Sequence, residues 1–234
     1  MWSYYGSKSK IVDCYPPPKY GKIIEPFAGS ARYALKYWQR DVVLMDKDEK
    51  IVKLWKWLQQ CSTNDLSELP NIKEGDSLDN YELSEGQKLF LSFCVNEGNT
   101  GGRKTVTKRA APKVRFKVNE TKKVLERIKH WDVRHGCYKE LDNTQATWFI
   151  DPPYQVGGEY YKHSSIEINF NDLSDWCKER NGQVIVCENM KADWLPFKPL
   201  KNHWGGIKKS VEAIWSNLPT AFDHQQGTLF NLNV

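Results

Sequence analysis

The chain has 234 residues, of which 40% are hydrophobic, and its formal net charge of +5 arises from 34 basic and 29 acidic residues. This length suits one large α/β domain, or one such domain with a modest insertion. No apolar run approaches the roughly 18 residues of a membrane span, and the amino terminus lacks the apolar core of a signal peptide. We therefore expect a cytoplasmic protein with no membrane partner.

The six cysteines and five histidines are scattered along the chain. They form no C-x-x-C pair, no H-E-x-x-H motif and no pair of histidines spaced four residues apart. Such spacing argues against a zinc site and against a disulfide framework. We therefore expect buried free thiols and no structural metal.

The first predicted strand, residues 22–27, is followed by a turn of small residues. The strand reads Lys-Ile-Ile-Glu-Pro-Phe, the turn is Ala28-Gly29-Ser30-Ala31, and residues 32–39 have helical spacing. Such a turn lets a nucleotide-like ligand approach the backbone, with the amides of the helix facing it. Near the amino terminus, Tyr4-Tyr5-Gly6-Ser7-Lys8 supplies two aromatic rings that are candidates for lining the same pocket.

The second predicted strand, Val42–Met45, ends in Asp46-Lys47-Asp48. Asp46 follows Gly29 by 17 positions, which places it to accept hydrogen bonds from ribose hydroxyls. The alternative is that one of these acids caps the next helix, Glu49–Gln60, and Asp48 is the better placed of the two for that role.

No strand with core alternation is evident between residues 62 and 131. Residues 64–81 are polar and rich in turn formers, and Ser84 with Gln87 resembles a capping box before the apolar run Leu89–Val95. Residues 119–131 have the spacing of a further helix. The pattern predicts a helical insertion between the second strand and the strands that follow.

Residues 98–118 are strongly basic. Their charged members are Arg103, Lys104, Lys108, Arg109, Lys113, Arg115 and Lys117, with no acid among them. A run of charge is commonly just a solvated face, but this run shows little helical periodicity. We interpret it as a mobile loop that fits a polyanion.

Residues 147–154 read Thr-Trp-Phe-Ile-Asp-Pro-Pro-Tyr. The prolines must end the strand, and ligands of open α/β sheets bind outside the carboxyl ends of strands. Asp151 then presents a carboxylate, Pro152 and Pro153 present free carbonyls, and Tyr154 presents a flat face. This set suits the exocyclic amine of a planar base, although Asp-Pro also commonly starts a plain turn.

The remaining chain completes an α/β pattern. Residues 155–165 are either a flap over the site or a surface loop. Residues 170–180 are predicted to be helical and Gln183–Cys187 to form a buried strand. Residues 210–216 alternate in character, which favours an antiparallel pair at the edge of the sheet.

With these motifs in this order, the chain resembles the S-adenosylmethionine-dependent DNA adenine-N6 methyltransferases. It is most similar to the small deoxyadenosine-methylase family of bacteria and phages, and the resemblance covers nearly the whole chain. It implies an α/β, Rossmann-like class I methyltransferase sheet with a small, mostly helical insertion. Residues 1–61 and 132–234 would form the catalytic domain, and residues 62–131 would recognise the target.

The resemblance also implies site residues. The catalytic motif is Asp151, Pro152, Pro153 and Tyr154. The residues implied to bind S-adenosylmethionine are Tyr4, Tyr5, Gly6, Lys8, Glu25, Pro26, Phe27, Ala28, Gly29, Ser30, Asp46 and Asp151. Those predicted to contact double-stranded DNA are Asn96, Asn99, Arg103, Lys104, Lys108, Arg109, Lys113 and Arg115. The family's turn often has a second glycine where this chain has Ser30-Ala31, and the recognition region is short.

The mechanism expected from the motif is direct transfer. Asp151 and the Pro152 carbonyl accept the two hydrogens of adenine N6, and Tyr154 stacks on a base that has been flipped out of the duplex. Methylation of cytosine N4, methylation of adenine in RNA, and DNA binding by an inactive scaffold remain alternatives. A dehydrogenase fits less well because G-x-G-x-x-G is absent. No endonuclease-like segment and no obligate protein partner are evident, so a solitary modification enzyme is favoured over a fused restriction system.

Overall fold

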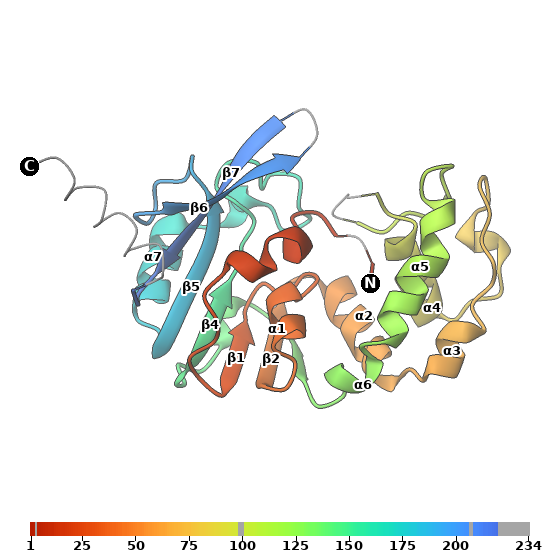
Figure 1. The fold of residues 1–234 in the computed structure, drawn as a ribbon, viewed down its shortest axis with the longest axis horizontal. Coiled ribbons are helices and arrows are strands. Elements are labelled where there is room, and N and C mark those ends of the chain that lie inside the picture. The colour runs from red at the N-terminus through yellow and green to blue at the C-terminus, as the bar shows by residue number, and fades with distance from the viewer. Residues whose placement is uncertain (3, 98–100, 206–207, 220–234) are drawn as a thin grey trace, which may run out of the picture.

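The computed structural model describes residues 1–2, 4–97, 101–205 and 208–219. Its framework is one seven-stranded sheet with the strand order β3-β2-β1-β4-β5-β7-β6 (Figure 1). The strands are β1 (Lys22–Glu25), β2 (Asp41–Asp46), β3 (Asp132–His135), β4 (Ala146–Ile150), β5 (Gly182–Asn189), β6 (Lys198–Gly205) and β7 (Lys208–Ser216).

The five strands from β3 to β5 in the sheet are parallel, whereas β7 runs antiparallel to both β5 and β6. An order that reverses direction beside β1 is that of a doubly wound α/β fold. The antiparallel β7 is inserted between β5 and the edge strand β6. The predicted fold class and the predicted antiparallel pair at the edge are confirmed.

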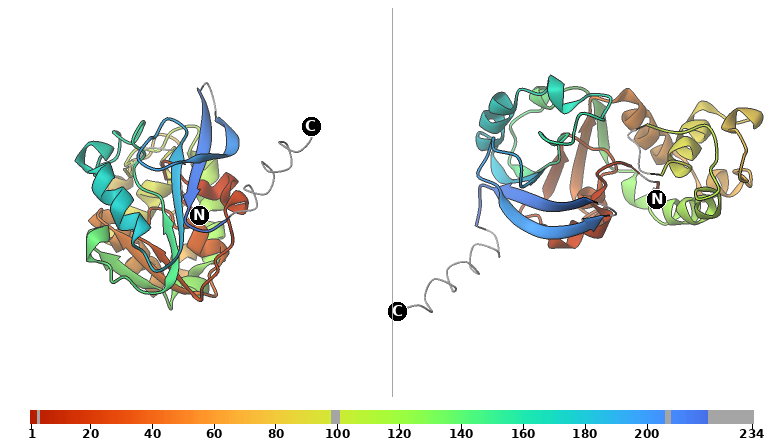
Figure 2. Two further views of the ribbon diagram at one scale, coloured as in Figure 1. Left: turned by 90° about the vertical axis from the view of Figure 1, so that its left-hand side faces the viewer. Right: turned by 90° about the horizontal axis from the view of Figure 1, so that it is seen from above.

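Both faces of the sheet are covered. Neighbouring residues of each buried strand point to opposite sides of the sheet, and they pack into two separate core clusters. Ile23 and Phe149 pack with α1 (Arg32–Lys36) and α2 (Glu49–Gln60) in one core cluster. Ile24 and Trp148 pack with α7 (Phe170–Lys178) in a second cluster on the other face. The views in Figure 2 show this layering around the sheet.

Local capping chemistry fixes the helix starts that were predicted. The Asp48 side chain accepts a hydrogen bond from the Lys50 amide at the start of α2, so the predicted cap is confirmed. Ser84 and Gln87 form a reciprocal capping box at the start of α4 (Glu85–Cys94), also as predicted. The helix expected over residues 32–39 is shorter, because α1 ends at Lys36.

The segment between α2 and β3 is helical and lies beside the sheet (Figure 1). It contains α3 (Thr63–Ser67), α4, α5 (Ala111–Lys122) and α6 (Leu125–Ile128), and the pair Ser77 and Thr105 forms an isolated bridge. Short 3-10 turns occur at Lys8–Lys10, Val12–Cys14, Leu78–Asn80, Tyr138–Glu140 and Ser165–Glu167. Phe90 and Val114 belong to the same core cluster as the α2 face of the sheet.

The prediction of a mobile basic loop over residues 98–118 is wrong for its last third. Residues 111–118 belong to α5, which has Pro112 in its first turn, where a proline costs no hydrogen bond. Lys117 is buried and donates hydrogen bonds to the carbonyl oxygens of Cys94 and Asn96 just beyond α4. The helix expected over residues 119–131 therefore begins earlier and breaks between α5 and α6.

No helix in the described part of the chain is long and apolar enough to cross a membrane. All six cysteines are described and all are free. Four of them are buried, as predicted, whereas Cys14 and Cys137 are partly exposed.

Candidate active site

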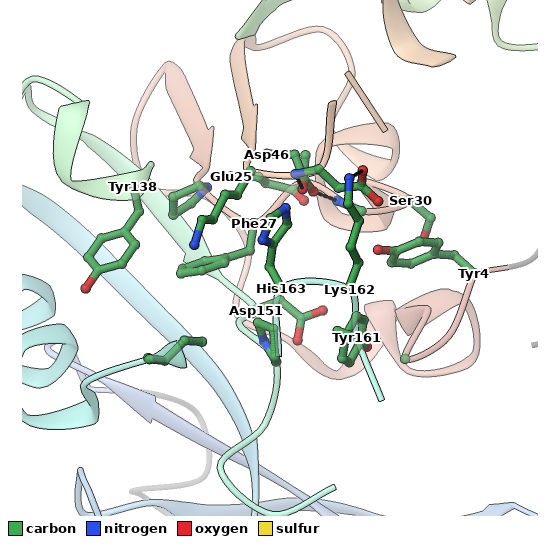
Figure 3. A pocket seen from close by; sticks show the side chains of 18 of the residues that line it. Tyr4, Glu25, Phe27, Ser30, Asp46, Tyr138, Asp151, Tyr161, Lys162 and His163 are labelled. Atoms are coloured by element: carbon green, nitrogen blue, oxygen red, sulfur yellow. Dashed lines mark hydrogen bonds and ion pairs between the residues drawn. The ribbon is translucent and has the colours of Figure 1, made fainter. Parts of the chain in front are cut away.

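A cavity of about 350 Å³ opens where the parallel strands end. Its walls come from the amino-terminal segment, the residues after β1, β2 and β3, the Asp151 corner after β4, and residues between 161 and 169 (Figure 3). This volume lies within the usual range of small-molecule sites. The position agrees with the rule that open α/β sheets bind ligands at the carboxyl edge of their strands.

The turn after β1 is built for a close backbone approach. Gly29 has φ +44°, and a Cβ atom there would lie 3.0 Å from the Tyr4 ring. Trp55 Nε1 donates a hydrogen bond to the Gly29 carbonyl, which fixes the turn from below. Ala31 also has a positive φ, of 42°, at the start of α1. Thus Ser30-Ala31, where the family often has a second glycine, still forms a left-handed turn.

Asp46, at the end of β2, is tied to this turn. Its Oδ2 accepts from the Gly29 amide at 2.9 Å, and its Oδ1 accepts from the Asp48 amide at 2.8 Å. Burial raises the pKa of Asp46 to about 6, although both amide bonds act in the opposite direction. Each carboxylate oxygen keeps a second lone pair, so the side chain remains able to accept bonds from a ligand's hydroxyls.

Glu25, at the end of β1, is a buried acid that faces the start of α1. Its Oε1 accepts from the Ala34 amide at 2.6 Å, and the residue is 2% exposed. Burial raises the pKa of Glu25 from 4.5 to about 8, against the opposing effect of the Ala34 bond. At neutral pH the carboxyl is therefore largely protonated.

Replacement of Glu25 by Gln should change how stability depends on pH. The pKa is higher in the folded state, so this group's stabilisation is present below pH 4.5 and is lost as pH rises to about 8. Between these two pH values the free energy of unfolding should fall by up to about 1.4 kcal/mol per pH unit. Glu25→Gln should remove this dependence on pH. Urea unfolding at pH 5, 6.5 and 8 measures it, with the exposed Glu126→Gln as control. If the free energy of unfolding changed with pH in the same way in wild type and in Glu25→Gln, the assignment would be contradicted.

Asp151, directly after β4, forms an ion pair with Lys8, whose Nζ lies 2.8 Å from Asp151 Oδ1. Lys8 also donates to the Gly6 carbonyl at 3.1 Å. Burial raises the pKa of Asp151 to about 6, while Lys8 acts to lower it. Burial lowers the pKa of Lys8, but the carboxylates of Asp151 and Glu212 outweigh this, and the net pKa is raised. At neutral pH the pair is ionic, and Asp151 is an acceptor.

The other members of the predicted catalytic motif lie differently. Pro153 lines the cavity, whereas Pro152 is buried and neither Pro152 nor Tyr154 is among the described residues that line it. The Tyr154 hydroxyl donates to Glu212 Oε1, and Lys8 Nζ lies 4.6 Å from the centre of the Tyr154 ring. The Tyr154 ring is thus held next to Lys8, outside the cavity lining.

Residues 155–165, here called the flap, run along the cavity. Tyr161, Lys162, His163 and Ser164 line it (Figure 3). The Tyr161 hydroxyl donates to the Tyr5 carbonyl at 3.2 Å, and Lys162 Nζ lies 3.1 Å from Asp48 Oδ1. Gly6 has φ +70°, and a Cβ atom there would lie 2.5 Å from the Tyr161 hydroxyl oxygen. The flap therefore connects the amino-terminal segment with the end of β2.

We expect Lys162→Gln to loosen the flap. The Lys162 side chain is 56% exposed, so its ion pair with Asp48 is worth no more than about 1 kcal/mol. Amide hydrogen exchange in residues 156–164 should therefore be roughly up to fivefold faster. The matched control is Lys178→Gln, which removes an exposed pair with Asp175 on α7. Unchanged exchange in the flap, or an equal change in the control, would contradict this role.

The structure brings all twelve residues predicted to bind the cofactor to one cavity, although they come from four separate segments. Sequence reasoning missed a further group of lining residues, which includes Arg32, Gly136, Cys137, Tyr138, Lys139 and Asn169. Of these, Tyr138 packs against Phe27 with ring centres 5.4 Å apart, which gives the cavity an aromatic wall. The residues after β3 were missed because β3 itself was not predicted.

One of the residues predicted to contact DNA is not available as expected. Asn96 is fully buried, and its carbonyl accepts from Lys117, so the prediction that its side chain reads base edges is wrong for this conformation. Asn99 lies outside the described residues.

The remaining predicted cations are exposed: Arg103, Lys104, Lys108, Arg109, Lys113 and Arg115. Several already have protein partners. Lys104 pairs with Asp79 at 3.0 Å and Arg109 with Glu97 at 3.4 Å. Such exposed pairs are worth little, so they exchange readily for a phosphate.

No protein-family model and no curated protein sequence matches this chain. Among solved structures, it is similar to a Haemophilus influenzae protein described as a methylase, with 13% identity and a TM-score of 0.33, over 85% of this chain and 80% of that one. It is also similar to the rRNA methyltransferase aviRa of Streptomyces viridochromogenes, with 15% identity and a TM-score of 0.35, over 82% and 76% of the two chains. These are likenesses of fold alone.

Proposed function

We propose that this protein transfers a methyl group from S-adenosylmethionine to the N6 amine of adenine in double-stranded DNA. The observation that carries the proposal is the meeting of two strand-end acids in one cavity. Asp46 lies beside the glycine turn, and Asp151 lies at the corner after β4. An acid after the second strand suits a ribose, and an acid followed by two prolines suits an exocyclic amine.

The chemistry of the cavity fits the cofactor. Asp46 keeps lone pairs for ribose hydroxyls, and the wall formed by Phe27 and Tyr138 suits a planar base. When bound, S-adenosylmethionine supplies an electrophilic methyl group on a sulfonium.

Asp151 acts on the other reactant. Its carboxylate accepts a hydrogen bond from the amine, which draws nitrogen lone-pair density out of the ring and toward the methyl group. As the nitrogen–carbon bond forms, the carbon–sulfur bond would break and S-adenosylhomocysteine would leave with the electron pair. This is stabilisation of developing charge by a fixed acceptor. The amine sheds a proton on methylation, and a carboxylate with a pKa of about 6 is able to take it.

We assign target recognition to residues 62–131. This segment is helical beside the cavity, and the exposed cations between Arg103 and Arg115 belong to it. Exposed Lys and Arg side chains bind phosphates irrespective of sequence, and Arg also pairs with guanine. The target base must leave the duplex to reach Asp151, at a cost of a few kcal/mol.

The test is methyl transfer from labelled S-adenosylmethionine to unmethylated duplex DNA, followed by mass spectrometry of the nucleosides. N6-methyladenine is the expected product. N4-methylcytosine would keep the site but change the base, and N6-methyladenosine formed only in added RNA would move the proposal to RNA. Cofactor binding without transfer to either acceptor would overturn the proposal in favour of a binding role.

A further inference from the structure

Glu212 is a buried acid that the proposed mechanism has not used. It lies in β7, opposite Asn189 of β5 and Lys201 of β6, and is 7% exposed. Strand β7 comes late in the chain but lies beside β5 in the sheet. It therefore brings the Glu212 carboxylate next to the turn after β4, which lies about 60 residues earlier in the chain.

Three groups converge on the Glu212 carboxylate. Its Oε1 accepts from the Tyr154 hydroxyl at 2.5 Å and from the Tyr15 hydroxyl at 2.6 Å, and Lys8 Nζ lies 3.6 Å away. The same Lys8 ammonium lies 2.8 Å from Asp151 and 4.6 Å from the centre of the Tyr154 ring. Glu212 therefore contacts both neighbours of Asp151: the ring that follows the two prolines and the ammonium that pairs with it.

We propose that Glu212 is a positioning residue for methyl transfer, which holds the Tyr154 ring and the Lys8 ammonium in place around Asp151. This inference rests on the proposed function. Glu212 lies behind Tyr154 and does not line the cavity in the described structure, so it acts through these neighbours.

Two physical effects give the position its value. The Tyr154 hydroxyl bond fixes the orientation of the ring, and a misplacement of about 1 Å near a reacting centre can cost on the order of 10²-fold in rate. The second acceptor near Lys8 limits the ammonium's hold on Asp151 Oδ1. Two carboxylates share one ammonium here, so Asp151 keeps acceptor capacity for the substrate amine.

The test compares variants that remove hydrogen bonds to Glu212 Oε1. In Glu212→Leu, which leaves no side-chain acceptor for the Tyr154 hydroxyl, kcat should fall by about 10- to 100-fold, while the KM for S-adenosylmethionine stays at its wild-type value. Tyr154→Phe keeps the ring but loses its bond and should show the same fall. The double variant should be no slower than either single variant, because both single variants remove the same hydrogen bond between Tyr154 and Glu212.

Tyr15→Phe is the matched control. It removes the other hydroxyl from Glu212 Oε1 but leaves the Tyr154 bond, so its kcat should stay near wild type. An equal loss in Tyr15→Phe and Tyr154→Phe would overturn the inference, and this comparison holds even if Glu212→Leu does not fold. Wild-type kcat in Glu212→Leu would also overturn it while the proposed function stands. A wild-type protein that methylates no acceptor overturns the proposed function, and this inference with it.

Discussion

Asp151→Asn should slow methyl transfer strongly while leaving the protein folded and able to bind cofactor. The asparagine amide keeps one oxygen, which can still accept from Lys8 Nζ in place of Asp151 Oδ1. Its nitrogen then faces the substrate amine, so that two donors meet where an acceptor is needed. We expect kcat to fall on the order of 10²- to 10³-fold, the usual cost of losing one preorganised polar group.

The measurement is single-turnover transfer to duplex DNA, with the affinity for S-adenosylhomocysteine measured by calorimetry on the same samples. Asn is preferred to Ala because Ala would remove both side-chain oxygens and leave Lys8 with the Gly6 carbonyl and the more distant Glu212. The surface variant Asp142→Asn is the control for the same loss of one negative charge, and it should stay at wild-type activity. Full turnover by Asp151→Asn would remove the carboxylate from the mechanism.

Neutralising Arg103, Lys104, Lys108 and Arg109 to Gln should weaken DNA binding and flatten its salt dependence. Each phosphate contact contributes about 0.9 to the slope of log K against log salt, so four lost contacts would lower that slope by up to about 3.6. Lys104 and Arg109 already pair with Asp79 and Glu97, so each loses its ion pair with that acidic side chain when it binds phosphate. The observed change should therefore be smaller than the full value.

The matched control carries the same loss of four charges at the opposite edge of the sheet. Lys19 and Lys22 precede or begin β1, Arg40 precedes β2, and Lys178 precedes β5. All four are at the amino ends of parallel strands, away from the cavity, and their replacement by Gln should leave the salt slope unchanged. Equal slopes for the two quadruple variants would show that binding responds to net charge alone and would contradict the assignment of residues 62–131.

The parts of the fold that follow from local chemistry could be predicted from the sequence. The bounds of α2, Glu49–Gln60, follow from the Asp48 cap and the helical spacing behind it. β1, β2, β4 and β5 are nearly continuous apolar runs, because both of their faces are covered. β3 was missed because it is an edge strand in which only Val133 is buried.

The interior of the helical insertion could not be predicted in the same way. α5 packs a mixed face against its neighbours, with Val114 and Val118 buried beside Lys117 and Thr121. A buried lysine that satisfies two carbonyls leaves no signal in hydrophobic spacing. Pro112 and the basic residues around it instead favoured a loop.

The residues of the site also fall into a group that could be predicted from the sequence and a group that could not. Gly29, Asp46 and Asp151 belong to short motifs, and they could be placed because strand ends meet at one edge of a sheet. The bonds from Lys162 to Asp48 and from Tyr154 to Glu212 join segments 114 and 58 residues apart. Such long-range pairs depend on the three-dimensional path of the chain, and no local pattern indicates them.

The hydrophobic core runs without a break from the sheet into the helical insertion. Trp55 contacts Trp2 and Trp131, with ring centres 4.9 and 5.5 Å apart, and Trp57 contacts Phe90 of α4 at 5.6 Å. An insertion exchanged from a relative would have to supply new partners for these rings. Loss of one large aromatic contact set costs about 3–5 kcal/mol, out of a total stability of about 5–15 kcal/mol. Residues 62–131 are therefore not a modular cassette. Under the proposed role of this segment in target recognition, a change of specificity would come from point changes on its exposed side rather than from recombination.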